Sequence, residues 1–171
     1  NMKEVKPSSG HACLYIGFDK SAVQLGINDT NLWVYPSYDH DTNVKKFNDN
    51  QENSFPVLYM SFASSKDPDW DKNHPNKATM EVIVPSAFIH YEKWAELPWK
   101  NRGESYEKYK DELSKRIIKE VYKHCPHLEN QISYYELSTP LSTRNLANYE
   151  LGELYGIEHD PNRFRQKWLK P

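Results

Sequence analysis

The side chains best able to do chemistry in this chain are few and scattered. Only two cysteines occur, Cys13 and Cys125, so neither a disulfide framework nor a four-thiolate zinc site can be built from this chain. His124, Cys125 and His127 stand where a helix is expected to meet Pro126, and only two of the three can face the same way. Histidine near a helix C-terminus is favoured by the helix dipole in any case. We therefore expect no metal site.

Glycine spacing excludes a nucleotide cradle within these residues. The six glycines never fall in the G-x-G-x-x-G or G-x-x-x-x-G-K-S/T spacings that let backbone amides approach a pyrophosphate. A G-x-S-x-G nucleophile elbow and a C-x-x-C pair are also missing. The sequence therefore assigns no catalytic residue, and it predicts that the chain does not bind a dinucleotide by itself.

Composition predicts one folded domain over residues 1–171. The chain is 37% hydrophobic and 13% aromatic, and at this length folding buries about 70% of the extended surface, which is enough for a core. Its 22 basic and 24 acidic residues leave a formal charge of -2, which disfavours a nucleic-acid partner. No apolar run approaches the ~20 residues of a membrane span. With two cysteines and no signal peptide, the sequence favours a cytoplasmic setting.

The elements that must position any site begin with strands. Residues 12–18 alternate between two faces, with Cys13, Tyr15 and Gly17 on one of them, as in a strand covered on both sides. Four further segments are rich in β-branched and aromatic residues and are bounded by Pro, Asn, Asp or Ser. These predicted strands are residues 32–35, 57–62, 79–84 and 132–137.

The strongest helix pattern covers residues 104–124, where apolar residues recur at steps of three and four opposite a face of Lys and Glu. Shorter helices are expected at 43–47, capped by Asp41 or Thr42, after the N-cap Ser86 as far as Trp94, and at 141–148. The order of elements predicts an α+β fold with a mostly antiparallel mixed sheet of about five strands and helices packed on one side. The predicted buried stripe of the long helix is Tyr106, Tyr109, Leu113, Ile117 and Val121.

Several strings, taken in order, resemble the middle segment of the phytoene desaturase, carotenoid isomerase and retinol saturase family of FAD-dependent oxidoreductases. The match spans nearly the whole chain and is best with the retinol saturase-like branch. No string is specific alone, and the order and spacing carry the resemblance. The strings are SSG (8–10), LYIG (14–17), YMSFASSKDPDW (59–70), RGESY (102–106), STPLST (138–143) and GELYGIEH (152–159), with Trp94 and Trp99 between them.

The resemblance implies an incomplete enzyme. In that family a substrate domain is inserted into a discontinuous FAD fold, and here neither flavin-binding flank is present. The chain then corresponds to an excised substrate domain of an oxidoreductase that acts on C–C bonds of a polyene, carotenoid or retinoid. Its partners would be an apolar small molecule and the flavin domain of the same full-length protein, with peripheral membrane contact of that protein left open. Asn1-Met2 as an addition left by cloning also stays open.

The resemblance also suggests site residues. Tyr15, Tyr59 and Met60 are candidates for the wall of an apolar substrate tunnel, although large side chains of this kind more often form core. Gly152, Tyr155 and Gly156 are candidates for the segment that faces the flavin, because glycines permit close backbone approach to a flat ligand. A simple turn at these glycines is the alternative.

A different class of function stays open, namely a non-catalytic module that binds a lipid or another protein. The insertion hypothesis makes a geometric prediction that distinguishes the two. A domain spliced into another leaves and re-enters it nearby, so residues near Ser9 and Phe164 should emerge on one side, together with residues 152–156.

Overall fold

The computed structural model describes residues 4–169, so the interpretation of Asn1-Met2 lies outside the described residues. The chain forms two compact units, which are considered in turn. The first contains the described residues up to Ala12, Pro85–Asn101 and the described residues from Ser138 onward, and the second contains Cys13–Val84 and Arg102–Leu137.

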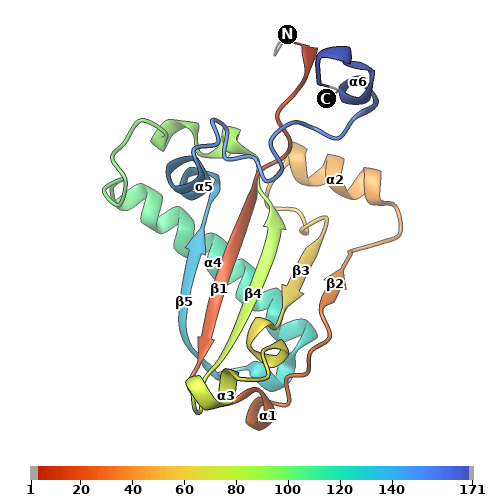
Figure 1. Cartoon of the computed structure of the whole chain (residues 1–171). Coiled ribbons are helices and arrows are strands. Elements are labelled where there is room, and N and C mark those ends of the chain that lie inside the picture. Colours follow the sequence, from red (N-terminus) through yellow and green to blue (C-terminus); the bar gives the residue numbers. More distant parts are fainter. Residues whose placement is uncertain (1–3, 170–171) are drawn as a thin grey trace. The chain divides into compact units, whose positions relative to one another are not determined.

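A five-stranded sheet in the order β2-β3-β4-β1-β5 forms the centre of the second unit. The β2–β3 and β3–β4 pairs are antiparallel, and neighbouring arrows point in opposite directions across the sheet (Figure 1). The predicted α+β fold with an antiparallel sheet is therefore confirmed, and all five predicted strands are present. Their bounds are β1 His11–Phe18, β2 Leu32–Val34, β3 Leu58–Ser61, β4 Ala78–Pro85 and β5 Ile132–Ser138.

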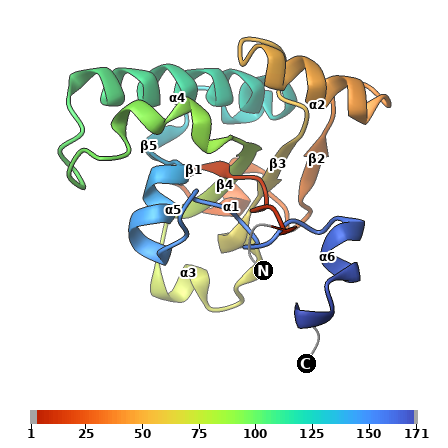
Figure 2. The same cartoon turned by 90° about the horizontal axis from the view of Figure 1, so that it is seen from above.

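Helix α4, Glu104–His124, has the predicted bounds and covers one face of this sheet (Figure 2). Acidic residues lie in its first turn and basic residues in its last, as the helix dipole favours. It ends where Pro126 makes continuation impossible. The predicted stripe is buried at Tyr106, Leu113, Ile117 and Val121, and half-buried at Tyr109.

Alternation along the strands sorts the side chains of the sheet into two unlike faces. One face is buried against α4, and every second residue of β4 on that face is less than 2% exposed. The other face is half-exposed. The larger strand side chains buried on the α4 side are Leu14, Ile16, Phe18, Leu58, Met60, Met80, Val82, Val84 and Leu137.

Short helices complete the second unit. Helix α2, His40–Asp49, starts before the predicted 43–47 because Asp39, and not Asp41 or Thr42, is the cap: its carboxylate accepts a hydrogen bond from the Thr42 amide at 3.1 Å. Helices α1, Ala22–Leu25, and α3, Trp70–Asn73, were not predicted, since four residues are too few to show a period. The 3-10 turns are η2 Ala63–Lys66 and η5 Pro126–Leu128.

The first unit corrects one prediction. No amphipathic α-helix follows Ser86; the segment forms two 3-10 turns, η3 Phe88–His90 and η4 Glu92–Trp94. Ser86 does not cap a helix, because its hydroxyl is hydrogen-bonded at 2.7 Å to the hydroxyl of the buried Tyr91. The predicted helix at 141–148 is confirmed as α5, Pro140–Ala147. The remaining elements are α6 Pro161–Arg165 and η6 Lys167–Leu169.

Two segments far apart in the sequence lie side by side in the first unit (Figure 1). The Ser8 amide donates to the Gly156 carbonyl at 2.6 Å, and the Leu154 amide donates to the Ser9 carbonyl at 3.0 Å. An antiparallel bridge joins Pro7 to Ile157. The chain therefore enters this unit beside the place where residues 153–158 run.

Gly152 packs too closely to accept any side chain. A Cβ there would lie 2.1 Å from the Pro140 carbonyl oxygen, and its φ of +59° is strained for other residues. Gly156 has a similar φ of +70°, but open space on its Cβ side. The pair therefore separates a steric requirement from a conformational one.

We expect Gly152→Ala to destabilise the chain more than Gly156→Ala. The strained φ should cost each variant about 1–2 kcal/mol, and the clash should cost Gly152→Ala about 1–3 kcal/mol more. Urea unfolding followed by circular dichroism measures both differences. Equal losses in the two variants would contradict the packing described for Gly152.

Candidate functional site

The sheet face opposite α4 carries a cluster of aromatic side chains, here called the aromatic face. Trp33 lies directly across from Tyr59, and Tyr59 lies across from Ile83. The Trp33 and Tyr59 ring centroids are 4.4 Å apart. Three of the rings are well exposed, with 61% of Trp33, 60% of Tyr134 and 46% of Tyr15 accessible. The aromatic face consists of Tyr15, Trp33, Tyr59, Ile83 and Tyr134.

Alternation places these residues on one side. Tyr15 is two residues from Gly17 on β1, and a Cβ at Gly17 would lie 3.7 Å from the Tyr134 Cβ, so β1 and β5 present both residues to the same side. Gly17 leaves the neighbouring Tyr134 uncovered. Large apolar side chains left this accessible on one sheet face are typical of a binding surface.

The three residues suggested for substrate contact do not share a surface. Tyr15 and Tyr59 lie on the aromatic face, whereas Met60 points to the opposite side of β3 and is fully buried on the α4 side. The substrate role of Tyr15 and Tyr59 stays a prediction. Trp33 and Tyr134 were missed, because their place beside Tyr59 and Tyr15 depends on strand order and register.

Two titratable groups on this face stay protonated at neutral pH. Burial raises the pKa of the Cys13 thiol to about 11, with a smaller opposing effect of its hydrogen bond to Tyr15 and a small further rise from the Glu81 carboxylate. Burial, then Cys13 and Glu81, raises the pKa of Tyr15 to about 12. The face therefore presents a neutral thiol and a neutral phenol, and it offers no thiolate nucleophile.

A polar edge borders the aromatic face at β3, formed by Asn31, Ser61 and Lys66. The Asn31 amide donates to the Tyr59 hydroxyl at 2.7 Å. The Lys66 ammonium donates to the Asn31 side-chain oxygen and, at 3.3 Å, to the Ser61 hydroxyl. Ser61 is in turn the cross-strand partner of Glu81. One edge of an otherwise apolar surface can therefore bind polar groups.

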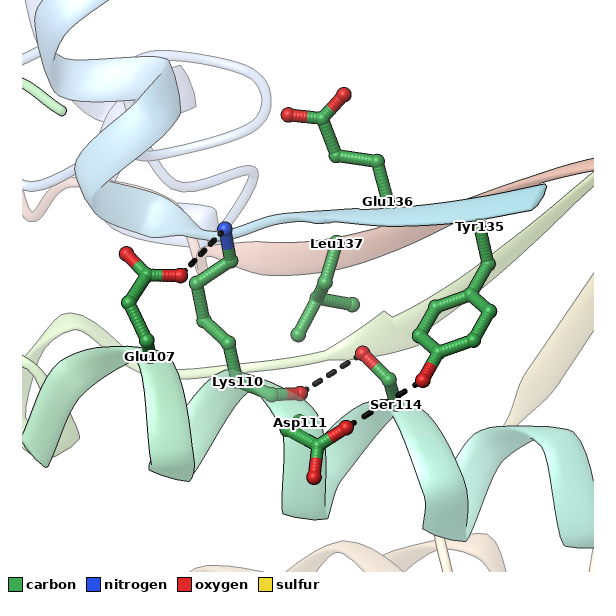
Figure 3. A pocket seen from close by; sticks show the side chains of 7 residues that line it. All are labelled: Glu107, Lys110, Asp111, Ser114, Tyr135, Glu136 and Leu137. Carbon is green, nitrogen blue, oxygen red and sulfur yellow. Dashed lines mark hydrogen bonds and ion pairs between the residues drawn. The ribbon is translucent and has the colours of Figure 1, made fainter. Parts of the chain in front are cut away.

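A separate pocket of about 180 Å³ lies between α4 and β5 (Figure 3). Its polar groups already bind one another: Lys110 lies 3.7 Å from Glu107, and the Tyr135 hydroxyl donates to Asp111 at 3.3 Å. Glu136 points away from the pocket (Figure 3). The volume is well below the ~300 Å³ at which small-molecule sites begin. A second pocket, of about 170 Å³ and near Phe55 and His124, is no larger.

The residues suggested to face a flavin lie together in the first unit. The close approach at Gly152 is to the chain's own Pro140 carbonyl, which explains that glycine without a ligand. Tyr155 is 69% exposed, and its amide donates to the Ser8 hydroxyl at 3.0 Å. Gly156 has open space on its Cβ side. The role of Tyr155 and Gly156 toward a flavin stays a prediction.

Residues 4–169 hold no group of three or more His, Cys, Asp or Glu side chains placed to bind a metal ion. Within the same described range, no helix is both long enough and apolar enough to cross a membrane.

Fold and site together define an α+β domain whose antiparallel sheet is covered by one long helix and bears aromatic residues on its other face. By sequence the chain is similar to retinol saturase-like proteins, which agrees with the resemblance. It is 30% identical over 160 residues to all-trans-retinol 13,14-reductase of Rattus norvegicus, covering 91% of this chain and 26% of that protein. The Homo sapiens protein of that name is 29% identical, covering 93% of this chain and 27% of that protein.

The chain spans about a quarter of the length of the curated relatives it matches. A Danio rerio protein named inactive all-trans-retinol 13,14-reductase is 26% identical over 150 residues, covering 85% of this chain and 25% of that protein. Similarity over this segment therefore does not distinguish active from inactive relatives. No protein-family model matches the chain.

The raised pKa of Cys13 predicts that its thiol reacts slowly with thiol reagents. In a Cys125→Ser variant, where Cys13 is the only cysteine, reaction with Ellman's reagent at pH 8 should be roughly a hundredfold slower in the folded chain than in urea, because so little thiolate is present. The same variant in urea is the control. A folded-state rate within a few-fold of the rate in urea would contradict the burial of this thiol.

Proposed function

We propose that this chain is the substrate-binding domain of an FAD-dependent oxidoreductase that saturates, desaturates or isomerises C–C bonds of a polyene such as a retinoid or carotenoid. The single observation that carries the proposal is the aromatic face of the second unit. The comparisons support it, because the relatives that match this segment are named for a reaction of all-trans-retinol.

A flat polyene suits a row of aromatic rings on a sheet. Offset stacking on rings such as Trp33 and Tyr59 contributes beyond the burial of apolar area. Neither of the two pockets described in this unit can enclose an elongated ligand. The substrate would therefore lie on the aromatic face and be sealed from water by another part of the full-length protein.

The arrangement of the first unit supports insertion into a larger fold. The Ser8 and Ser9 backbone pairs with Gly156 and Leu154, so the entering segment runs beside residues 153–158. A domain inserted into a flavin-binding domain should leave and re-enter it nearby, and this pairing supports the part of that prediction that concerns residues 152–156, while the expected position of Phe164 beside Ser9 stays a prediction. Tyr155 and Gly156 would then face the flavin-binding domain of the same protein. When bound there, FAD would supply hydride transfer, and this chain would position the substrate.

The alternative is a lipid-binding or protein-interaction module without catalysis. This alternative is supported by the match of the same segment to the Danio rerio relative that is named inactive. The described residues also contain no group that the geometry marks as catalytic. Both functions would use the aromatic face. The two hypotheses differ in whether the full-length protein binds a flavin.

The aromatic face should bind retinol through Trp33. Replacing Trp33 by alanine should weaken binding of all-trans-retinol to the chain roughly two- to tenfold, the usual value of one aromatic contact. The matched control is Trp168→Ala, which removes an exposed tryptophan from the first unit. Retinol fluorescence titration gives both affinities. Equal affinities for the two variants and the unaltered chain would contradict a substrate role for this face.

The absence of a phosphate cradle predicts weak flavin binding. Isothermal titration of FAD into the chain should show no submicromolar site, whereas the full-length protein should retain FAD on gel filtration. Tight FAD binding by the chain alone would contradict the proposed division of labour. A full-length protein free of flavin would favour the non-catalytic module.

A further inference from the structure

Ser61, in the polar edge of the aromatic face, has a hydrogen-bond donor, Lys66, on one side and an acceptor, Glu81 of the neighbouring strand, on the other. We infer that Lys66 and Glu81 are specificity-determining residues that bind the terminal hydroxyl of a polyene alcohol lying on the aromatic face. This inference rests on the proposed function and adds to it the end group of the substrate and the residues that select it.

Lys66 has one donor to spare. An ammonium group carries three N–H donors, and Lys66 uses two of them on the Asn31 side-chain oxygen and the Ser61 hydroxyl. Among residues 4–169, the ion pairs within 4.0 Å do not include Lys66, and both of its hydrogen-bond partners are neutral. Asn31 is itself bound to the Tyr59 hydroxyl, which ties the ammonium to the aromatic face.

Glu81 supplies the acceptor. It pairs across the strands with Ser61, the serine whose hydroxyl accepts from Lys66 at 3.3 Å. The donor and the acceptor therefore flank one side chain. Glu81 is half-buried, and the alternation of β4 places it on the same side of the sheet as Ile83, two residues along the strand, which belongs to the aromatic face.

This pair matches an alcohol better than other end groups. A hydroxyl accepts one hydrogen bond and donates one, which satisfies Lys66 and Glu81 together. A carboxylate would accept from Lys66 but be repelled by Glu81, and a hydrocarbon end would leave both groups without a new partner. The geometry therefore predicts that binding affinity decreases from the polyene alcohol to the acid and from the acid to the hydrocarbon.

The test measures binding of all-trans-retinol, all-trans-retinoic acid and the deoxy hydrocarbon of retinol to the chain and its variants. Lys66→Met should weaken retinol binding about tenfold, as expected for a hydrogen bond from a charged group, and leave the hydrocarbon unchanged. Glu81→Gln should strengthen retinoic acid binding several-fold by removing the like charge. Lys45→Met, at an exposed lysine on α2, is the matched control and should change nothing.

The outcomes separate this inference from the proposed function. If Trp33→Ala weakens retinol binding while Lys66→Met and Glu81→Gln change no affinity, the end-group site is wrong and the substrate face stands. If no polyene binds, or Trp33→Ala has no effect on any of them, the proposed function fails and the inference fails with it. Because Glu81→Gln is expected to raise an affinity, a partly unfolded variant cannot imitate the result.

Discussion

The second unit depends on one contact, the packing of the α4 stripe against a single face of the sheet. Ile117 and Val121 of the stripe are fully buried, as are strand residues such as Met60 and Val82. Each large apolar side chain buried in this way contributes about 1.5–3 kcal/mol. Because successive side chains of a strand point to opposite faces, the apolar residues packed against α4 alternate with residues that face the other way. The residues on that other face are not needed for packing against α4.

That division of labour explains the chemistry of the candidate site. Burial keeps the Cys13 thiol and the Tyr15 phenol protonated, so the aromatic face offers shape and hydrogen bonds but no nucleophile. The Lys66 ammonium lies at its polar edge, bound to Asn31 and Ser61. Such a surface suits the proposed role, in which it would hold and orient an apolar molecule while another part of the protein supplies the reaction. This is the role expected of a substrate domain whose cofactor is bound by another part of the protein.

The first unit is built on different interactions. Backbone hydrogen bonds from Ser8 and Leu154 join two segments separated by more than a hundred residues. Just before the second of these segments, Gly152 packs tightly against Pro140. The close approach to Pro140 accounts for a glycine at position 152, and contact of this residue with a flavin stays a prediction. Sequence reasoning placed a helix after Ser86 because a serine before apolar residues resembles a cap, but the Tyr91 hydroxyl competes for that serine.

The sequence by itself determined the α+β fold, the five strands and the bounds of α4. The spacing of apolar residues and the residues that end a helix can both be recognised from neighbouring positions in the sequence. It also determined the likeness to retinol saturase-like proteins, which spans nearly the whole chain. Only the tertiary structure decided which residues share a surface. Tyr59 and Met60 are adjacent in sequence yet lie on opposite faces, whereas Trp33 and, through Asn31, Lys66 come together with Tyr59 from separate segments. Strand order and register create such neighbours, and neither is encoded by the spacing within a single strand.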